Sequence, residues 1–297
     1  MRRLTVALAV AFLSVSSTAF AQPAVWTVRG AHATAVIFGS IHLLPPGLDW
    51  RPPGLAAILA KADELWFELP IDALTGEEAA RLARSRGLLP KGDSLFNHLS
   101  AADRARLEAA GERLGLPARF VSPMRPWLAE VTLSLAQDSR AGAVAGQGVE
   151  QQISAEAPAG VRRRAFETTS EQINFLAEAS MADQVASLDQ TIAEIADDPD
   201  LYQRVVKTWL AGDLEGLQRD ALTPLAKASP RIYRRLITDR NRRWAAVLAR
   251  RLKGQGVIVV VVGTGHLLGP DGLPALLKAR GLAVEEPSTT LPASASH

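Results

Sequence analysis

The sequence predicts an α/β fold in which a central, mostly parallel sheet carries a large helical insertion between its first and last strands. Residues 257–262 are six consecutive β-branched apolar residues, typical of a strand buried on both faces of a parallel sheet. Residues 35–44 repeat the construction of residues 257–268: an apolar strand, Gly, Ser or Thr, one residue, His and two Leu. Between these two strands apolar residues recur every three or four positions, which predicts helices.

The first 21 residues have the features of a secretory signal peptide. A basic start is followed by a short apolar run and by Ala19-Phe20-Ala21, a small-residue cleavage site. We therefore expect cleavage near Ala21 and a periplasmic or secreted protein. The apolar run is too short to span a membrane, and no span is expected in the mature chain. Residues 22–286 are expected to form one domain, and the small, polar residues 287–297 a disordered tail.

A hairpin and a βαβ unit are predicted at the start of this domain. Residues 25–28 and 34–38 have strand composition and flank a turn that contains His32. A helix is expected over residues 55–62 and a strand over residues 64–69, where apolar residues alternate.

The middle of the chain is predicted to be helical, with one short strand at residues 164–166. The glycine-rich stretch 142–148 lacks a phosphate-loop pattern and is expected to be a flexible linker. The expected helices share apolar spacings of three and four, and they cover residues 76–86, 101–114, 126–137, 149–157, a segment from Ser170, 185–195 and 201–209.

The last part of the domain is predicted to return to the sheet. A long helix starts at Asp239, and Arg240 lies one turn before Trp244 on its apolar face. We expect Arg240 to have either a structural role, in which it pairs with a buried carboxylate or caps a neighbouring turn, or a role facing a substrate. A helix over residues 272–279 and a strand over residues 283–285 follow.

Two histidines and a glutamate are the candidate functional residues. His42 and His266 each follow the carboxyl end of a predicted strand, and Glu68 lies near the end of another, just before Pro70. Because ligand sites of parallel sheets lie outside the carboxyl ends of the strands, we expect the three side chains to meet at one rim. The alternative for each residue alone is an ordinary loop or core position.

Composition excludes several classes of function. Lys and Arg number 33 against 31 Asp and Glu, so the net charge of +2 gives no basic footprint for nucleic acid. There is no cysteine, which excludes disulfides, a thiol nucleophile and a Cys-ligated zinc ion.

The motifs resemble those of the TraB/GumN family, whose animal relatives include the Tiki proteases. The resemblance rests on two G-x-x-H motifs, Gly39 to His42 and Gly263 to His266, on Glu68 between them, and on the pair Arg240-Asn241. Glu167 and Gln172 also resemble the central segment of the family. The resemblance implies an α/β domain with a helical insertion and a metal-dependent hydrolase that is proteolytic in the animal relatives. Some bacterial members are associated with exopolysaccharide gene clusters.

The residues are chemically consistent with a metal-dependent hydrolase. Two His and one carboxylate, here His42, His266 and Glu68, can hold a divalent ion such as Mn, Co or Zn and leave positions open for water and substrate. The ion would lower the pKa of water and polarise a carbonyl group. Glu68 is either a ligand or the general base, and the candidates for the remaining role are Asp49, Glu150 and Glu167. Ser40 and Thr264 are expected to hydrogen-bond within their loops, and His98 to cap or pack.

Three hypotheses about function follow from these observations. The leading one is an exported metal-dependent hydrolase that acts on a peptide or protein substrate. The second is a protein that binds haem, a metal or a glycan fragment without turnover. The third is an accessory factor in polysaccharide or envelope assembly.

Overall fold

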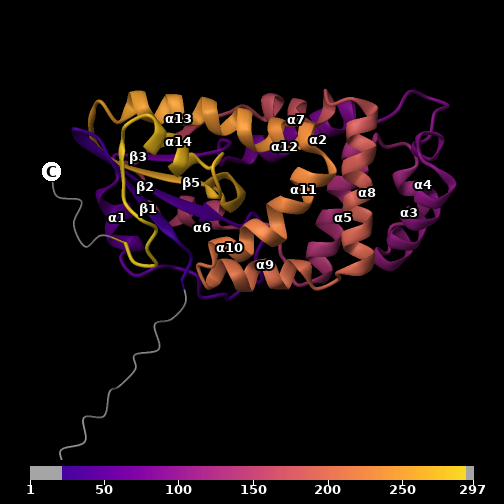
Figure 1. The fold of residues 1–297 in the computed structure, drawn as a ribbon, viewed down its shortest axis with the longest axis horizontal. Coiled ribbons are helices and arrows are strands. Elements are labelled where there is room, and N and C mark those ends of the chain that lie inside the picture. The colour runs from indigo at the N-terminus through magenta and orange to yellow at the C-terminus, as the bar shows by residue number, and fades with distance from the viewer. Residues whose placement is uncertain (1–21, 292–297) are drawn as a thin grey trace, which may run out of the picture.

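The sheet is mostly parallel, as the sequence predicts. It lies at one end of the molecule (Figure 1). The computed structural model describes residues 22–291, so the predicted signal peptide and the last six residues of the predicted tail lie outside the described part. The strand order is β4-β3-β5-β2-β1-β6. β4, β3, β5 and β2 are parallel neighbours, and β1 pairs antiparallel with β2 and β6. The strands are β1 Val25–Arg29, β2 His32–Ser40, β3 Glu64–Phe67, β4 Arg162–Ala165, β5 Gln255–Gly263 and β6 Ala283–Val284.

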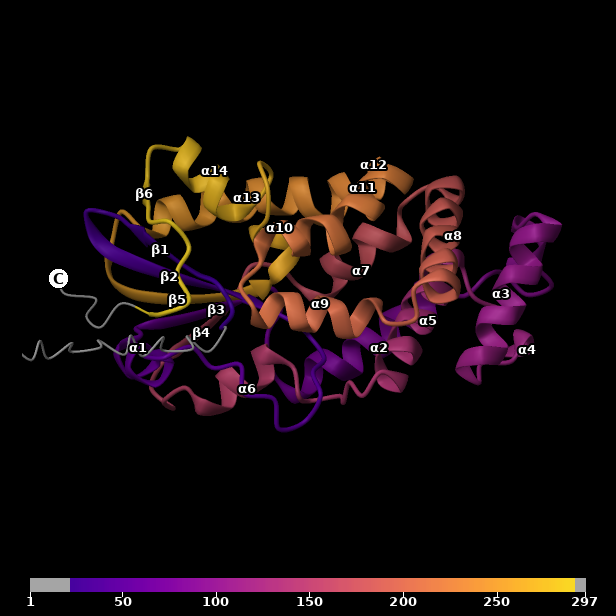
Figure 2. The same ribbon diagram turned by 60° about the horizontal axis from the view of Figure 1, so that its bottom comes forward.

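The β-branched run of β5 is buried on both faces of the sheet. Val257, Val259 and Val261 belong to one apolar cluster, and Ile258, Val260 and Val262 belong to another. Burying each such side chain stabilises the fold by about 1.5–3 kcal/mol, so a continuous apolar run is what a central strand needs. The second face is covered by α13 (Asp239–Arg251) and α14 (Leu273–Ala279), and the first by α1 (Leu55–Lys61) and α6 (Val149–Glu156) (Figure 2).

The helical insertion extends away from the carboxyl rim of the sheet, and α3 and α4 lie at the opposite end of the molecule in both views (Figures 1 and 2). α3, α5 and α8 pack around a third apolar cluster that includes Leu107, Leu133 and Leu188. The other α-helices of the described residues are α2 Ala73–Gly87, α3 Ala101–Leu114, α4 Ala118–Val121, α5 Pro126–Arg140, α7 Thr169–Ala177, α8 Met181–Asp197, α9 Leu201–Leu210, α10 Leu214–Leu217, α11 Thr223–Ala228 and α12 Pro230–Tyr233.

The glycine-rich stretch 142–148 is packed against the His42 loop, so the prediction of a flexible linker is wrong. The Val144 N–H donates to the Leu44 carbonyl, and the Val149 N–H donates to the Ile41 carbonyl. A β-carbon on Gly148 would lie 2.0 Å from the His42 carbonyl oxygen, so only glycine fits this contact without a shift of the backbone.

Smaller differences concern the ends of elements. His32 is the first residue of β2 rather than part of the turn, and β4 starts two residues earlier than expected. The beginning of the predicted tail is packed: the Ser288 N–H donates to the Val25 carbonyl, and Leu291 is buried. Within residues 22–291, no helix combines the length and the apolar character needed to cross a bilayer.

Candidate functional site

His42, Glu68 and His266 meet at the carboxyl rim of the sheet, as the sequence predicts. β2 and β5 are parallel neighbours with Ser40 opposite Gly263, so the two G-x-x-H motifs leave the sheet at the same level. β3 lies on the other side of β5, with Phe67 opposite Val261, and its chain leads directly into Glu68. The His266 Nε2 atom is 3.7 Å from Glu68 Oε1.

Gly263 leaves a small space between His42 and Glu68. The point where a β-carbon on residue 263 would lie is 3.1 Å from Glu68 Oε1 and 3.4 Å from His42 Nε2. The backbone of Gly263 has a φ of −49°, which any residue can adopt, so the limited space rather than the conformation favours glycine here. We call this space the Gly263 cradle.

His42 forms a dyad with Glu150. The His42 Nδ1 atom is 2.5 Å from Glu150 Oε1, and the Ser40 hydroxyl donates to the same oxygen at 2.6 Å. The Glu150 side chain is 6% exposed, whereas the His42 side chain is 65% exposed. A buried carboxylate therefore holds an imidazole ring whose other nitrogen, Nε2, is at the cradle.

The dyad changes the acidity of both partners. The negative charge of Glu150 raises the pKa of His42 to about 9, against the opposing effect of desolvation. Burial alone would raise the pKa of Glu150, but the charge of His42 and the hydrogen bonds from His42 and Ser40 lower it. Glu150 is thus ionised, and His42 carries a proton at neutral pH.

His266 is buried and neutral. Asn241 Nδ2 donates to the carbonyls of His266 and Asp271, so Asn241 Oδ1 must accept from Nδ1 of His266, at 2.7 Å. Nε2 of His266 then has a lone pair that accepts from Arg240 Nη1 at 3.0 Å. The ring packs on Trp244, with 4.4 Å between ring centroids. Burial, the largest effect, lowers the pKa of His266 to about 3.

Arg240 is the centre of the buried charges. Its guanidinium Nη2 is 2.6 Å from Glu68 Oε2 and 2.8 Å from Glu167 Oε2. The two carboxylates lie side by side because the Glu167 N–H donates to the Glu68 carbonyl at the end of the β3–β4 pair. Of the two roles expected for Arg240, pairing with buried carboxylates is the one observed.

The remaining oxygen of Glu68 faces the cradle. Glu68 Oε1 accepts from the Gly263 N–H at 2.7 Å, and Gln172 Nε2 is 3.3 Å from Oε2. Burial alone would raise the pKa of Glu68, but Coulombic interactions with His266, Arg240 and His42 and the Gly263 hydrogen bond lower it to about 2. Glu68 is therefore ionised at neutral pH.

The other candidates have roles that the structure distinguishes. Glu150 pairs with His42, Glu167 holds Arg240, and Asn241 fixes the His266 ring. Asp49 is exposed and does not belong to this network. Gly39 allows close approach, since a β-carbon there would be 2.8 Å from Thr264 Oγ1.

The expected loop contacts are also present, and His98 forms an ion pair. Thr264 Oγ1 donates to the Ser40 carbonyl, which confirms the loop hydrogen bonding expected for Ser40 and Thr264. His98 lies at the end of a short 3₁₀ helix and pairs with Asp93; neither residue lines the cavity at the rim.

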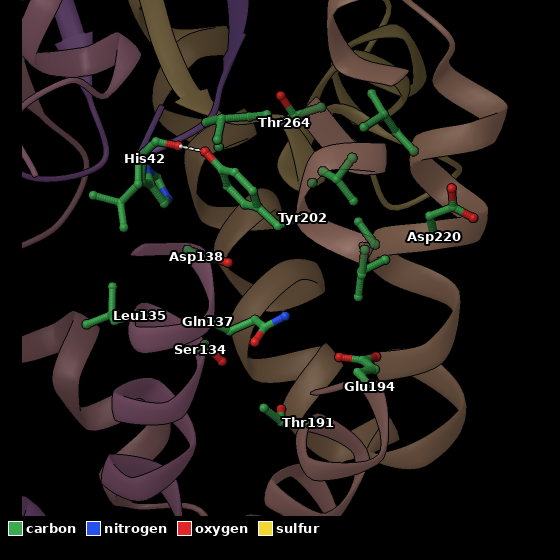
Figure 3. Close-up of a pocket in the computed structure, with 18 of the residues that line it drawn as sticks. His42, Ser134, Leu135, Gln137, Asp138, Thr191, Glu194, Tyr202, Asp220 and Thr264 are labelled. Atoms are coloured by element: carbon green, nitrogen blue, oxygen red, sulfur yellow. Dashed lines mark hydrogen bonds between the residues drawn. The ribbon is translucent and has the colours of Figure 1, made fainter. Parts of the chain in front are cut away.

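A cavity of about 470 Å³ opens beside His42 and the Gly263 cradle (Figure 3). Its walls come from the rim of the sheet and from α5, α8 and α9. Tyr202 lies across it and donates its hydroxyl to the Leu43 carbonyl at 2.9 Å. No motif in the sequence marks the residues that α5, α8 and α9 contribute; the one available signal is that Ser134 and Asp138 lie four positions apart, on one face of a helix.

A metal ion fits these residues only in part. In residues 22–291 there is no group of three or more His, Cys, Asp or Glu residues that could hold a metal ion. His266 Nε2 and Glu68 Oε2 already accept from Arg240. His42 Nε2 and Glu68 Oε1, on either side of the cradle, are the two atoms of the predicted ligand set that Arg240 does not engage.

Comparison with known proteins agrees with the sequence motifs. A model of the TraB/PrgY/gumN family matches residues 24–286. The chain is also similar to an uncharacterized protein of Treponema pallidum (strain Nichols), with 23% identity over 270 residues that cover 86% of this chain and 80% of the relative. No solved structure gives a significant match.

Proposed function

The chain belongs to the TraB/PrgY/gumN family, and from that premise and the geometry of the rim we propose that it is a hydrolase of peptide bonds in which His42 activates water. The observation that carries the proposal is the dyad: an exposed imidazole held by a buried carboxylate, in the wall of a cavity. General bases are commonly histidines whose second nitrogen is fixed by a carboxylate.

In the proposed mechanism, Nε2 of the neutral form of His42 takes a proton from a water molecule in the Gly263 cradle as that water attacks the carbonyl carbon of the substrate. Nε2 then gives the proton to the leaving amine nitrogen as the C–N bond breaks. Glu150 accepts from Nδ1 throughout, so it fixes the tautomer and stabilises the imidazolium that forms. Because Glu150 raises the pKa of His42 to about 9, the neutral, basic form of the ring is the minor form at neutral pH, and turnover should rise as the pH approaches 9.

The buried network of Glu68, Arg240 and His266 holds the residues around the cradle in position. Glu68 Oε1 holds the Gly263 backbone at the cradle through the 2.7 Å hydrogen bond. Arg240 keeps Glu68 ionised and in place. Glu68 and His266 are positioning residues in this proposal rather than the reacting pair.

A divalent ion, Mn, Co or Zn, is the second candidate for the group that activates water. The favourable observation is the cradle, where His42 Nε2 and Glu68 Oε1 would be two ligands. His266 does not fit as the third ligand while Arg240 donates to its Nε2. A bound ion would supply a water of lowered pKa. Elemental analysis of protein purified without chelators, beside Gly263→Ala, tests this candidate: one ion per chain that Gly263→Ala removes would favour it.

Peptide turnover tests the proposed activity directly. The purified chain without residues 1–21 is incubated with a mixture of fluorescence-quenched peptides, and the new termini are identified by mass spectrometry. We expect hydrolysis that falls by roughly 100-fold or more in His42→Gln, as for loss of a general base. The matched control is His98→Gln, because His98 also pairs with a carboxylate but lies away from the cavity. Equal turnover by both variants would contradict the proposal.

A second pair of variants tests the cradle itself. Gly263→Ala places a methyl group within 3.5 Å of both His42 Nε2 and Glu68 Oε1 and is expected to reduce turnover with little change in stability. Gly76→Ala in α2 is the control, since a β-carbon there meets nothing within 4 Å.

Non-catalytic binding is the alternative that the cavity favours, because its volume and largely apolar walls are those of a small-molecule site. A haem or glycan fragment that binds the chain, together with no turnover of any peptide, would support it. Export is proposed from the leader at residues 1–21, and the N-terminal sequence of protein recovered from the periplasm or medium tests it.

A further inference from the structure

The cavity beside His42 has two distinct ends. His42 and Thr264 are near the rim of the sheet, and Thr191 and Glu194 are at the opposite end, between α5 and α8 (Figure 3). A volume of about 470 Å³ is in the range of small-ligand sites. A group that enters beside His42 can therefore continue toward the helices of the insertion.

Apolar side chains form the middle of the wall. Leu135 comes from α5, Val205 from α9, and Leu217 and Leu268 from the segments that close the cavity. Leu135 is 48% exposed, which leaves an apolar surface available to an occupant. This part of the cavity suits a hydrocarbon chain.

The charges in the wall are almost all negative. The cavity is lined by Asp138, Glu194, Asp198 and Asp220, whereas His42 is the only basic residue in the lining. Asp198 and Asp220 are already paired with Arg204, and Asp220 also with Arg219. No arginine, lysine or histidine among residues 22–291 forms an ion pair with Asp138 or Glu194.

We propose that this cavity binds a lysine or arginine side chain of the peptide substrate, with its methylene stem against Leu135 and Val205 and its cationic head at Glu194. Asp138, nearer to His42 in Figure 3, adds negative charge along the way. The proposal rests on the proposed function, because the scissile bond must then lie beside His42. Lysine and arginine fit because each joins an apolar stem to a cation, as the wall joins apolar and acidic parts. The cavity determines where the side chain binds. The negative charges of Asp138 and Glu194, which form no ion pair within residues 22–291, favour a cation there.

Desolvation of the two acids supports this assignment. Burial raises the pKa of Asp138 to about 6, and burial is also the largest cause of the raised pKa of Glu194. An ionised carboxylate that has lost water without gaining a cation is destabilised, and a bound ammonium or guanidinium offsets that loss.

Matched peptides test the proposal on the complete mature chain. Three fluorescence-quenched decapeptides differ at a single position, which holds lysine, glutamate or norleucine, whose side chain has nearly the same stem as lysine but no charge. Further sets of three place this variable position at each other point of the peptide. We expect kcat/KM for lysine to exceed that for norleucine by roughly tenfold or more at one position, the effect of one charge-assisted hydrogen bond. Glu194→Gln and Asp138→Asn should reduce this ratio, whereas Glu108→Gln, an exposed acid on α3, should not.

Binding to His42→Gln separates this inference from the proposed activity. If no peptide is cleaved but the lysine peptide binds this variant more tightly than the norleucine peptide, and Glu194→Gln abolishes the difference, the inference holds and the proposed hydrolysis fails. If peptides are cleaved with no preference for lysine or arginine at any position, the inference is overturned and the hydrolysis stands. If peptides show no preference while free n-octylamine binds and loses affinity in Glu194→Gln, the peptide form of the inference is overturned in favour of a small amine.

A variant with the opposite charge at position 194 keeps the inference testable if the neutral variants fold poorly. Glu194→Lys should reverse the selectivity toward the glutamate peptide, as judged by kcat/KM ratios within one protein preparation. Unchanged selectivity in a variant with a normal melting temperature would also overturn the inference.

Discussion

The two G-x-x-H segments have the same sequence pattern and neighbouring positions, but their histidines have opposite environments. His42 is 65% exposed, pairs with a carboxylate and has its pKa raised to about 9. His266 is 6% exposed, accepts from an arginine and has its pKa lowered to about 3. The motif therefore determines where a histidine lies on the rim, and the neighbours from the rest of the chain determine whether it carries a proton.

The difference arises from what covers each loop. The His42 loop faces the cavity and is supported from behind by the 142–148 segment, with Glu150 at the start of α6. The His266 turn is covered by α13, which contributes Arg240, Asn241 and Trp244. One histidine is thus placed to exchange protons with a ligand, and the other to hold a buried network.

The largest expected effect is the loss of the buried cation that Glu68 and Glu167 share. Arg240→Ala leaves Glu68 and Glu167 buried without their common cation, so we expect a loss of about 3–5 kcal/mol in the free energy of unfolding, measured by urea denaturation. Arg243→Ala is the control, because Arg243 contacts Glu167 but is half-exposed, and it should cost about 1 kcal/mol or less. Similar losses in both variants would show that the buried network does not depend on Arg240.

Replacing each of the two histidines by glutamine should affect different quantities: peptide turnover for His42 and the free energy of unfolding for His266. We expect His42→Gln to reduce peptide turnover by roughly 100-fold with a change in unfolding free energy within about 1 kcal/mol. His266→Gln removes a buried ring from Trp244 and should cost about 2 kcal/mol or more in stability. A catalytic loss in His266→Gln at full stability would make His266 a reacting group and break the contrast.

The two histidines should also give opposite dependence of stability on pH. The folded pKa of His266 is below the unfolded value of 6.5, so its contribution is present above pH 6.5 and is lost as the pH falls toward 3. One such group changes the unfolding free energy by up to about 1.4 kcal/mol per pH unit, and His266→Gln should lack this part of the slope between pH 7 and 5. Urea unfolding at pH 5, 6 and 7 measures it, and His98→Gln should retain the full slope.

The contribution of His42 has the other sign. Its folded pKa is raised, so its contribution is complete below pH 6.5 and is lost as the pH rises through about 9. Exposure of the ring to solvent reduces the size of this effect.

The smallest expected effect concerns the pH dependence of the proposed peptide hydrolysis. In Glu150→Gln the ring loses the charge that raises its pKa, so the rising limb of kcat/KM against pH should move down toward 6.5, by roughly one unit or more. Ser40→Ala should move the limb less, because the Ser40 hydroxyl contacts Glu150 rather than His42. A limb that stays in place in Glu150→Gln would mean that His42 is not the group that titrates.

Much of the fold follows from short-range patterns in the sequence. The β-branched run of β5 and the apolar alternation near Leu65 and Phe67 predict central strands, because each side chain faces a covered side of the sheet. Apolar spacing predicted α3 with its observed bounds and α8 within a few residues. The packed state of the segment 142–148 was not predictable, since glycines that allow close approach and glycines of a free linker have the same local composition.

The sequence alone determined that His42, Glu68 and His266 share one rim, because parallel strands deliver the residues after their carboxyl ends to the same edge. Only the tertiary structure decided what each residue does there. Glu150 and Arg240 come from helices 108 residues after His42 and 26 residues before His266, and no local pattern links them to their partners. The protonation of a histidine depends on the charge and burial around it, and those are set by packing between distant segments.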